Sequence, residues 1–199
     1  MPVCKITTLF VERRAIPAYK TGHWLERLQG SIMYDIGDKI VYPMHGAGII
    51  EGIEDRVILG QKRKYYIMRV SSSKMKVMIP MENTDEIGVR NVIAPQEAKK
   101  VLEYFKKTPV SDDQNWNKRQ RENMIKIKSG DIYQVSSVLK DLMYRDKSKG
   151  LSISERKMLN NTRQILVSEL VMSGFAVEED IETIMDDIVD TMLFNGEEK

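Results

Sequence analysis

The fold of this chain is decided first by a stretch that begins at residue 39 and reads Lys39-Ile40-Val41-Tyr42-Pro43-Met44-His45-Gly46-Ala47-Gly48-Ile49-Ile50-Glu51-Gly52-Ile53-Glu54. Its β-branched and aromatic residues favour strands. A first strand, Lys39–Tyr42, is stopped by Pro43, which cannot donate to a sheet. The glycines of residues 45–48 are typical of a tight turn, and a second strand is expected at Ile49–Glu54. The stretch therefore predicts a β-hairpin.

Short apolar runs separated by turn residues continue to about residue 92. Gly60 marks the next reversal, and the last strands are expected at Lys64–Val70 and Met75–Pro80, separated by Ser71–Ser73. Short strands that follow one another in a segment of this length are typical of a small SH3-like or Tudor-like β-barrel. This fold is a common platform for protein contacts rather than for catalysis. We therefore expect residues 33–92 to form such a domain.

Beyond residue 94 the apolar residues repeat with a helical period. Pro95 suits a first helical position, and Ser152 begins a capping box that Glu155 closes. The pattern predicts five helices, which begin near residues 95, 116, 131, 152 and 178. Residues 95–199 are therefore expected to form an all-α, five-helix domain. The chain is expected to be an α+β protein in which the β-barrel comes first.

Residues 1–32 do not share this patterning. They carry basic and aromatic side chains, such as Arg13 and Trp24, but no sustained period and no apolar core of a signal peptide. Residues 23–29 are compatible with a short helix. Because Met33 opens the patterned part, residues 1–32 are expected to be a leader outside the fold: an added sequence, an over-extended reading frame or a lineage-specific arm.

The composition limits the class of protein. The chain has 199 residues, of which 42% are hydrophobic and 30% charged, enough for one or two globular domains. No apolar stretch approaches the roughly 20 residues that a membrane span needs. The single cysteine, Cys4, cannot form an internal disulfide and has no neighbours at metal-ligand spacing. We therefore expect a cytoplasmic protein without membrane, metal or cofactor.

The charge is segregated along the chain. The net charge is +2, yet residues 95–149 carry 13 basic against 8 acidic residues, and residues 150–199 carry 4 against 11. A basic segment beside an acidic one suits a nucleic-acid partner that is met at one face only, since a uniformly basic surface would bind DNA indiscriminately.

The motifs that usually signal catalysis are missing. The segment Gly46-Ala47-Gly48 lacks the lysine and the following helix of a phosphate-binding loop. His45 has no nucleophile beside it, and the pairs Asp112-Asp113 and Asp186-Asp187 make poor acid–base couples. The acidic run Glu178-Glu179-Asp180 complements a helix dipole, which is a structural role. We therefore expect no catalytic residues and no enzyme activity.

Trp116 heads a basic run, Asn115-Trp116-Asn117-Lys118-Arg119-Gln120-Arg121, just after the turn-forming segment 108–113. Two interpretations are open. An aromatic ring among cations at a helix start suits a wedge into nucleic acid, with Lys and Arg holding phosphates. Alternatively, Trp116 is the first core residue of a helix, because Met124 and Ile127 follow at helical spacing.

With a small β-domain and a basic helical domain in view, the sequence resembles the CarD/CdnL family of bacterial transcription regulators. In the β-domain the resemblance is carried by residues 34–48 (Tyr34 to Gly48), by Ile79-Pro80-Met81-Glu82-Asn83 and by Gly88-Val89-Arg90. In the helical domain it is carried by Asn115-Trp116-Asn117-Lys118-Arg119, Ser129-Gly130-Asp131, Val138-Leu139-Lys140-Asp141-Leu142, Gly150-Leu151-Ser152 and Arg163-Gln164-Ile165-Leu166. Together the motifs span residues 33 to about 193.

The resemblance implies how the two domains act. The Tudor-like domain would bind the β subunit of bacterial RNA polymerase, and the family's contact positions fall on Arg56, Ile58 and Met78, the last replacing a family arginine. The helical domain would touch promoter DNA at the upstream edge of the bubble, where the tryptophan enters the minor groove. The corresponding DNA-contacting residues would be Trp116, Lys118, Arg119, Arg121 and Arg156.

The expected function is thus to bind polymerase and stabilise the promoter open complex. The protein would act as a monomer and reach the nucleoid through polymerase. One alternative is a polymerase- or protein-interaction module without functional DNA contact. A nonspecific DNA-architectural protein is disfavoured, because residues 33–199 carry 26 basic against 27 acidic residues.

Overall fold

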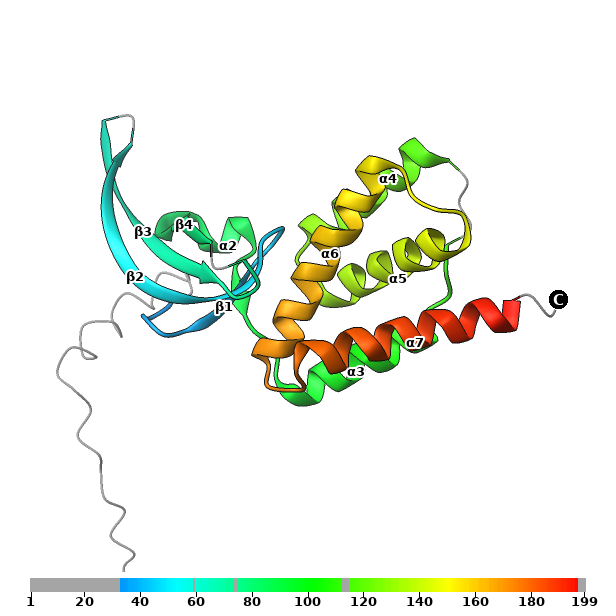
Figure 1. The fold of residues 1–199 in the computed structure, drawn as a ribbon. Coiled ribbons are helices and arrows are strands. Elements are labelled where there is room, and N and C mark those ends of the chain that lie inside the picture. Colours follow the sequence, from blue (N-terminus) through cyan, green and yellow to red (C-terminus); the bar gives the residue numbers. More distant parts are fainter. Residues whose placement is uncertain (1–32, 59, 74, 112–114, 197–199) are drawn as a thin grey trace, which may run out of the picture. The chain divides into compact units, whose positions relative to one another are not determined.

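The structure is a computed structural model that describes residues 33–58, 60–73, 75–111 and 115–196. The segment expected to be a leader, with its short helix over 23–29, lies outside these residues. A sheet region comes first and a helical region second (Figure 1). The sheet region contains β1 (Lys39–Tyr42), β2 (Gly46–Ile58), β3 (Gln61–Val70), β4 (Lys76–Pro80), the 3-10 helix η3 (Met81–Asn83), α2 (Thr84–Ile87) and β5 (Arg90–Asn91).

The helical region contains α3 (Pro95–Lys107), α4 (Trp116–Lys128), α5 (Ile132–Ser148), α6 (Ile153–Met172) and α7 (Glu178–Gly196). The five helices expected after residue 94 are therefore confirmed. Their local signals are present too: Pro95 stands at the first position of α3, Asp131 caps α5, and Ser152 forms its capping box with Glu155 at the start of α6. The α+β class, with strands first and helices after, is confirmed as well.

The strands form one antiparallel sheet in the order β4-β3-β2-β1-β5. β2 and β3 extend further than expected, because the hairpin pairs without a break from Gly52↔Ile67 out to Ile58↔Gln61. A register shift between Ile50 and Gly52 marks a bulge in β2. A bulge bends a strand, which helps a small sheet to curl around its own core.

The prediction that the glycines of residues 45–48 form a tight turn is wrong. The chain reverses one step earlier, over residues 43–45, where Met44 adopts φ +71°, and Gly46 already begins β2. Ala47 and Gly48 pair with Val41 and Ile40 of β1. The glycines are needed for close packing inside the strand: a Cβ on Gly48 would lie 2.4 Å from the carbonyl oxygen of Arg69.

One face of the sheet encloses a small core, made of Tyr34, Ile40, Ile50, Tyr66, Met68, Val70, Ile79 and Val89. Two tyrosine hydroxyls are tied within it. The hydroxyl of Tyr34 donates to the carbonyl oxygen of Val89 at 3.0 Å, and the hydroxyl of Tyr66 accepts from the backbone N–H of Tyr34 at 3.0 Å. Burial is the main reason that the pKa values of both tyrosines are raised.

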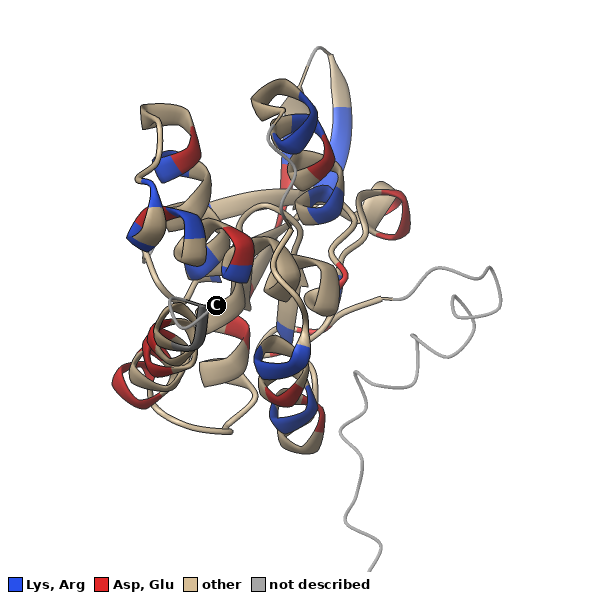
Figure 2. Ribbon diagram, turned by 90° about the vertical axis from the view of Figure 1, so that its right-hand side faces the viewer, with Lys and Arg blue, Asp and Glu red and all other residues tan. Residues whose placement is uncertain are grey.

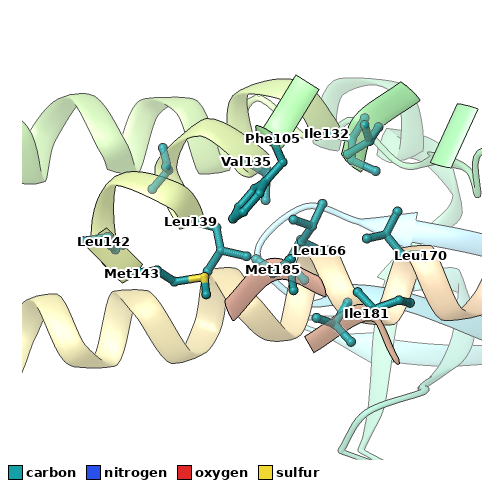
Figure 3. Close-up of a cluster of buried hydrophobic side chains, with 14 of the residues drawn as sticks. Phe105, Ile132, Val135, Leu139, Leu142, Met143, Leu166, Leu170, Ile181 and Met185 are labelled. Carbon is teal, nitrogen blue, oxygen red and sulfur yellow. The ribbon is translucent and has the colours of Figure 1, made fainter. Parts of the chain in front are cut away.

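A larger core lies between the helices. Side chains from α3, α5, α6 and α7 converge there, as Figure 3 shows for Phe105, Leu139, Leu166 and Met185. Each of these four is at most 1% exposed. Burying large apolar side chains contributes about 1.5–3 kcal/mol each, so this core accounts for much of the stability of the helical region.

Candidate functional site

Trp116 is the first residue of α4. The side chain of Asn115 caps the helix by accepting a hydrogen bond from the backbone N–H of Lys118 at 3.1 Å. The indole is 41% exposed, whereas Ile127, three turns later, is only 1% exposed. Ile127, with Met124 beside it, makes the contact of α4 with the core. The interpretation of Trp116 as a core residue is therefore not supported, and a large aromatic surface faces solvent at the start of the helix.

Three of the expected DNA-contacting cations are exposed. The side chain of Lys118 is 54% exposed and lies 4.0 Å from Glu122 Oε1. Arg121, one turn further, is exposed and borders a hollow along α4 that Lys128 also lines. On α6 the side chain of Arg156 is 61% exposed, 3.3 Å from Asp146 Oδ1 of α5. Exposed pairs of this kind hold their partners weakly, so these cations can turn towards phosphates.

Arg119 is placed differently from its neighbours. Its side chain is only 13% exposed, and its Nη2 donates to Glu155 Oε1 at 2.8 Å. The second oxygen of Glu155 accepts from the N–H of Ser152 at 3.2 Å and from the hydroxyl of Ser152 at 2.8 Å. Burial opposes ionisation of Glu155, but the bonds from Arg119 and Ser152 outweigh it and lower its pKa. The first turns of α4 and α6 are thus tied together.

Two adjacent residues of α5, to which the sequence analysis gave no role, hold the chain between the end of α3 and Ser111. Lys140 of α5 is 0% exposed, and its Nζ donates to the carbonyl oxygens of Lys106, at 3.0 Å, and of Thr108. Asp141 accepts from the backbone N–H of Ser111 at 2.9 Å through its Oδ1. Burial is the chief cause of the lowered pKa of Lys140 and of the raised pKa of Asp141.

A signal for Lys140 was available. It stands four residues after Ser136 and three before Met143, both buried, so helical spacing places it on the core face of α5. A lysine at such a position needs acceptors, because an unpaired buried ammonium is costly. The C-terminal carbonyls of α3 supply them, and the negative end of the helix dipole adds to the attraction.

The expected polymerase-contacting residues lie on one face of the sheet. Arg56 and Ile58 pair with Arg63 and Gln61 of β3, and Met78 pairs with Ile67. Positions 61, 63 and 67 are separated by even numbers of residues, and side chains on a strand alternate between faces. All three residues therefore share a face, opposite the one on which Tyr66 and Met68 fill the core.

This face offers exposed side chains of mixed character. Ile58 is 43% and Met78 48% exposed, and the side chain of Arg56 is 54% exposed while paired with Glu54 on the same strand. Met78 lies on β4, which is an edge of the sheet. We call Arg56, Ile58 and Met78 the outer-face residues.

Specific contacts join the sheet region to α6. The N–H of Ala47 donates to Ser168 Oγ at 3.0 Å, and Lys39 Nζ donates to the carbonyl oxygen of Met172 at 3.0 Å. Arg90 of β5 pairs with Glu169, whose side chain is 1% exposed, and Arg90 Nη2 also donates to the carbonyl oxygen of Gly130 at 2.9 Å. These contacts attach the sheet region to the helical region.

The other features considered in the sequence are metal ligands, His45, the acidic run 178–180 and membrane spans. Among the described residues there is no cluster of His, Cys, Asp and Glu that could hold a metal ion. His45 lies against the ring of Tyr42, with centroids 4.7 Å apart, and the acidic run 178–180 forms the first turn of α7. Figure 2 shows acidic residues gathered along the helix that leads to the C-terminus. Within the described part of the chain, no helix is long and apolar enough to cross a membrane.

Comparison with known proteins identifies two domains. Residues 34–93 match the CarD-like/TRCF RID domain, and residues 100–186 match the CarD C-terminal domain. The chain is 40% identical over 151 residues to the Bacillus subtilis (strain 168) protein named "Putative transcription factor YdeB", an alignment that covers 76% of this chain and 99% of that protein.

Two solved structures from Myxococcus xanthus resemble parts of the chain. One is CdnLNt, at 35% identity over 32% of this chain and 89% of that one; the other is the N-terminal domain of CarD, at 32% identity over 31% and 83%. Both have a TM-score of 0.27. The family models and the relative from Bacillus subtilis suffice: the chain belongs to the CarD/CdnL family and is a transcription regulator with an RNA polymerase-interacting domain.

Proposed function

We propose that this protein binds the β subunit of bacterial RNA polymerase through the outer-face residues of its sheet and stabilises the promoter open complex by inserting Trp116 into the minor groove at the upstream edge of the bubble. The observation that carries the proposal is the position of Trp116, an indole 41% exposed at the first residue of α4. Such a protein acts as a monomer in the bacterial cytoplasm and reaches the nucleoid through polymerase.

The surroundings of Trp116 suit this role. Apolar side chains that enter the minor groove unstack a base step, which costs a few kcal/mol. This cost is smaller where the step is already distorted. The edge of a melted bubble is such a place. Lys118 and Arg121 follow on the same helix with exposed side chains, and Arg156 supplies a third cation from α6. Contacts of this kind go to phosphates and carry little sequence information.

The weak overall charge explains why the protein needs polymerase. Residues 33–199 carry 26 basic and 27 acidic residues, so their affinity for duplex DNA alone is low. Binding to polymerase places the helical region beside the promoter and raises its local concentration there, typically to the millimolar range. Recognition of the promoter itself is then left to polymerase.

The effect on transcription follows from linkage. A ligand that binds the open complex better than the closed one shifts that equilibrium by its differential affinity. About 1.4 kcal/mol changes the equilibrium constant tenfold. Stacking of one base on an aromatic ring contributes roughly 1–3 kcal/mol, so Trp116 is sufficient for an effect of this size.

The test is the lifetime of open complexes formed by a bacterial RNA polymerase on a weak promoter, with and without the full-length protein. The protein is expected to lengthen the lifetime, and Trp116→Ala is expected to abolish most of the gain while polymerase binding is retained. The control variant is Val177→Ala, which shortens another exposed apolar side chain, 62% exposed, just before α7.

Two outcomes would count against the proposal. An unchanged gain for Trp116→Ala would exclude the wedge. No gain for the wild-type protein, with polymerase binding intact, would indicate an interaction module whose helices make no functional DNA contact.

A further inference from the structure

We infer that Arg119 is not a phosphate contact but a positioning residue, which holds the first turn of α4, and with it Trp116, through the buried carboxylate of Glu155. The inference deepens the proposed function and rests on it. It separates the cations of the basic run into two kinds, those that face DNA and one that faces the protein.

The first support is burial. Lys118 and Arg119 are neighbours on α4, and successive residues on a helix point about 100° apart, so one of two such cations can face solvent while the other faces the protein. The side chain of Lys118 is 54% exposed, and that of Arg119 is 13% exposed. A guanidinium that is mostly buried presents little of its surface to a phosphate.

The second support is the partner. Glu155 is buried to 7% exposure and is held by Ser152 on its other oxygen. Ser152 therefore fixes the place of this carboxylate independently of Arg119. A carboxylate that is fixed in this way is a rigid anchor, and a short charge-assisted bond of 2.8 Å transmits its position to α4. The bond joins the first turn of α4 to the first turn of α6.

The third support is energetic. Turning Arg119 towards a phosphate would leave Glu155 buried without its cation, and breaking a buried pair in this way costs about 3–5 kcal/mol. Arg156, which follows Glu155 on α6, is exposed and reaches DNA without such a loss. Phosphates are therefore held by the exposed cations, and Arg119 stays with Glu155.

The position of Arg119 explains what the pair does for Trp116. Arg119 comes three residues after Trp116, within one turn of the same helix. Asn115 caps this turn from within α4, whereas Arg119 ties it to a second helix. The direction of the indole is then determined by α6 as well as by α4. Without the pair, α4 keeps its cap but its first turn loses that tether.

The experiment compares Arg119→Ala with Arg121→Ala, which removes an exposed cation from the same helix. Each is made alone and in a Trp116→Ala background, and the open-complex lifetime is measured over a series of salt concentrations. Removing a phosphate contact reduces the salt slope by about one and adds to the loss caused by Trp116→Ala. We expect this for Arg121→Ala. For Arg119→Ala we expect an unchanged slope and no further loss once Trp116 is absent.

Glu155→Gln gives a test in which the two possible roles of Arg119 predict opposite changes in the open-complex lifetime. Glutamine preserves the capping box with Ser152, so α6 keeps its N-terminus, while the charge that holds Arg119 is lost. If Arg119 were a phosphate contact, releasing it and removing a negative charge would lengthen the open-complex lifetime. If Arg119 positions Trp116, Glu155→Gln shortens the lifetime, as Arg119→Ala does, and the double variant is no worse than either single one.

A readout without polymerase distinguishes failure of this inference from failure of the proposed function. In the full chain with Trp24→Phe, the fluorescence of Trp116 is quenched with acrylamide. Arg119→Ala and Glu155→Gln are expected to change the quenching constant, and Arg121→Ala to leave it unchanged. Unchanged quenching in all three variants, or additive losses of lifetime for Arg119→Ala and Trp116→Ala, would overturn the role of Arg119. An unchanged lifetime for Trp116→Ala alone would instead overturn the wedge.

Discussion

The Nη2 of Arg90, on β5, donates to Oε2 of Glu169, on α6, at 2.8 Å, and Nη1 of the same arginine contacts the other carboxylate oxygen. The pair is unequal in burial: the side chain of Glu169 is 1% exposed and that of Arg90 is 32% exposed. Glu169 also accepts from the backbone N–H of Ile93 at 3.4 Å, at the start of the connection to α3. The pair therefore joins the sheet, the connection and α6.

This inequality predicts which partner matters more. Arg90→Ala leaves a buried carboxylate without its cation and is expected to lower the free energy of unfolding by about 3–5 kcal/mol. Glu169→Gln leaves a partly exposed guanidinium, which water can solvate, and is expected to cost less. Urea unfolding followed by circular dichroism measures both.

The control for this pair is Lys100→Ala, which breaks an exposed ion pair on α3 and should leave the unfolding midpoint where it is. An effect of Arg90→Ala no larger than that of Lys100→Ala would show that the pair contributes nothing to stability. A larger loss for Glu169→Gln than for Arg90→Ala would show that the solvation argument is wrong.

A pair of glycines separates backbone strain from close packing. Both Gly46 (φ +88°) and Gly60 (φ +78°) adopt the left-handed conformation, which costs an alanine roughly 1–2 kcal/mol. A Cβ at Gly60 would meet nothing within 4 Å, whereas one at Gly46 would lie 2.6 Å from Ser168 Oγ and 3.3 Å from the Cα of Ile165.

Gly60→Ala is therefore expected to lower the free energy of unfolding by the backbone cost alone. Gly46→Ala should add the cost of overpacking against α6, typically about 1–3 kcal/mol, and so be clearly the more destabilised in the same urea experiment. Equal losses for the two variants would indicate that α6 moves away from β2 without resistance.

These glycines show what could be predicted for the fold. The helices were predictable because their signals are local: the capping box at Ser152 and the apolar period act within a few residues. The role of Gly46 was not predictable. A side chain at this position is excluded by Ser168, which lies 122 positions later in the chain, and not by a turn. The outer part of the β2–β3 hairpin was missed too, since its strands carry charged residues such as Asp55 and Lys62, which pair with each other.

The candidate site was predictable in the same uneven way. Helical spacing shows which residues of α4 share a face, but not how far along the helix that face is covered. It therefore grouped Trp116 with Ile127, although one is 41% and the other 1% exposed. The partner of Arg119 is not predictable from sequence either, because the capping box with Ser152 accounts for Glu155 within α6 alone.

A link between α3 and α5 gives a prediction that depends on pH. The hydroxyl of Tyr133 donates to Glu97 Oε1, and chiefly this bond raises the pKa of Tyr133 to about 12. Because the pKa is higher in the folded protein than in the unfolded chain, the bond stabilises the fold fully below pH 10, near the ordinary tyrosine value, and its contribution is lost as the pH rises from 10 towards 12.

Ultraviolet titration of the phenolate absorbance is expected to show this late-titrating tyrosine, and Glu97→Gln should move it towards pH 10. The control variant Tyr133→Phe should remove this late titration step altogether. Its persistence in Tyr133→Phe would assign the step to a buried tyrosine of the sheet core, Tyr34 or Tyr66, whose pKa values are also raised.

The last prediction concerns Met78, which stands where the family's arginine is expected. Its side chain is 48% exposed on the edge strand β4 and shares a face with Arg56. If this face binds the β subunit with cationic residues, Met78→Arg should tighten binding by up to about fivefold, which corresponds to about 1 kcal/mol, the upper end of what one exposed ion pair contributes. Arg56→Glu should abolish binding while the unfolding curve stays unchanged.

Met75→Arg is the matched control, because Met75 is 56% exposed three residues earlier, outside β4. Binding to purified polymerase is measured at two salt concentrations. The gain from Met78→Arg should shrink as the salt concentration rises, because exposed charges are screened. An equal gain from Met75→Arg would reduce the effect to general charge, and retained binding in Arg56→Glu would place the polymerase contact elsewhere on the protein.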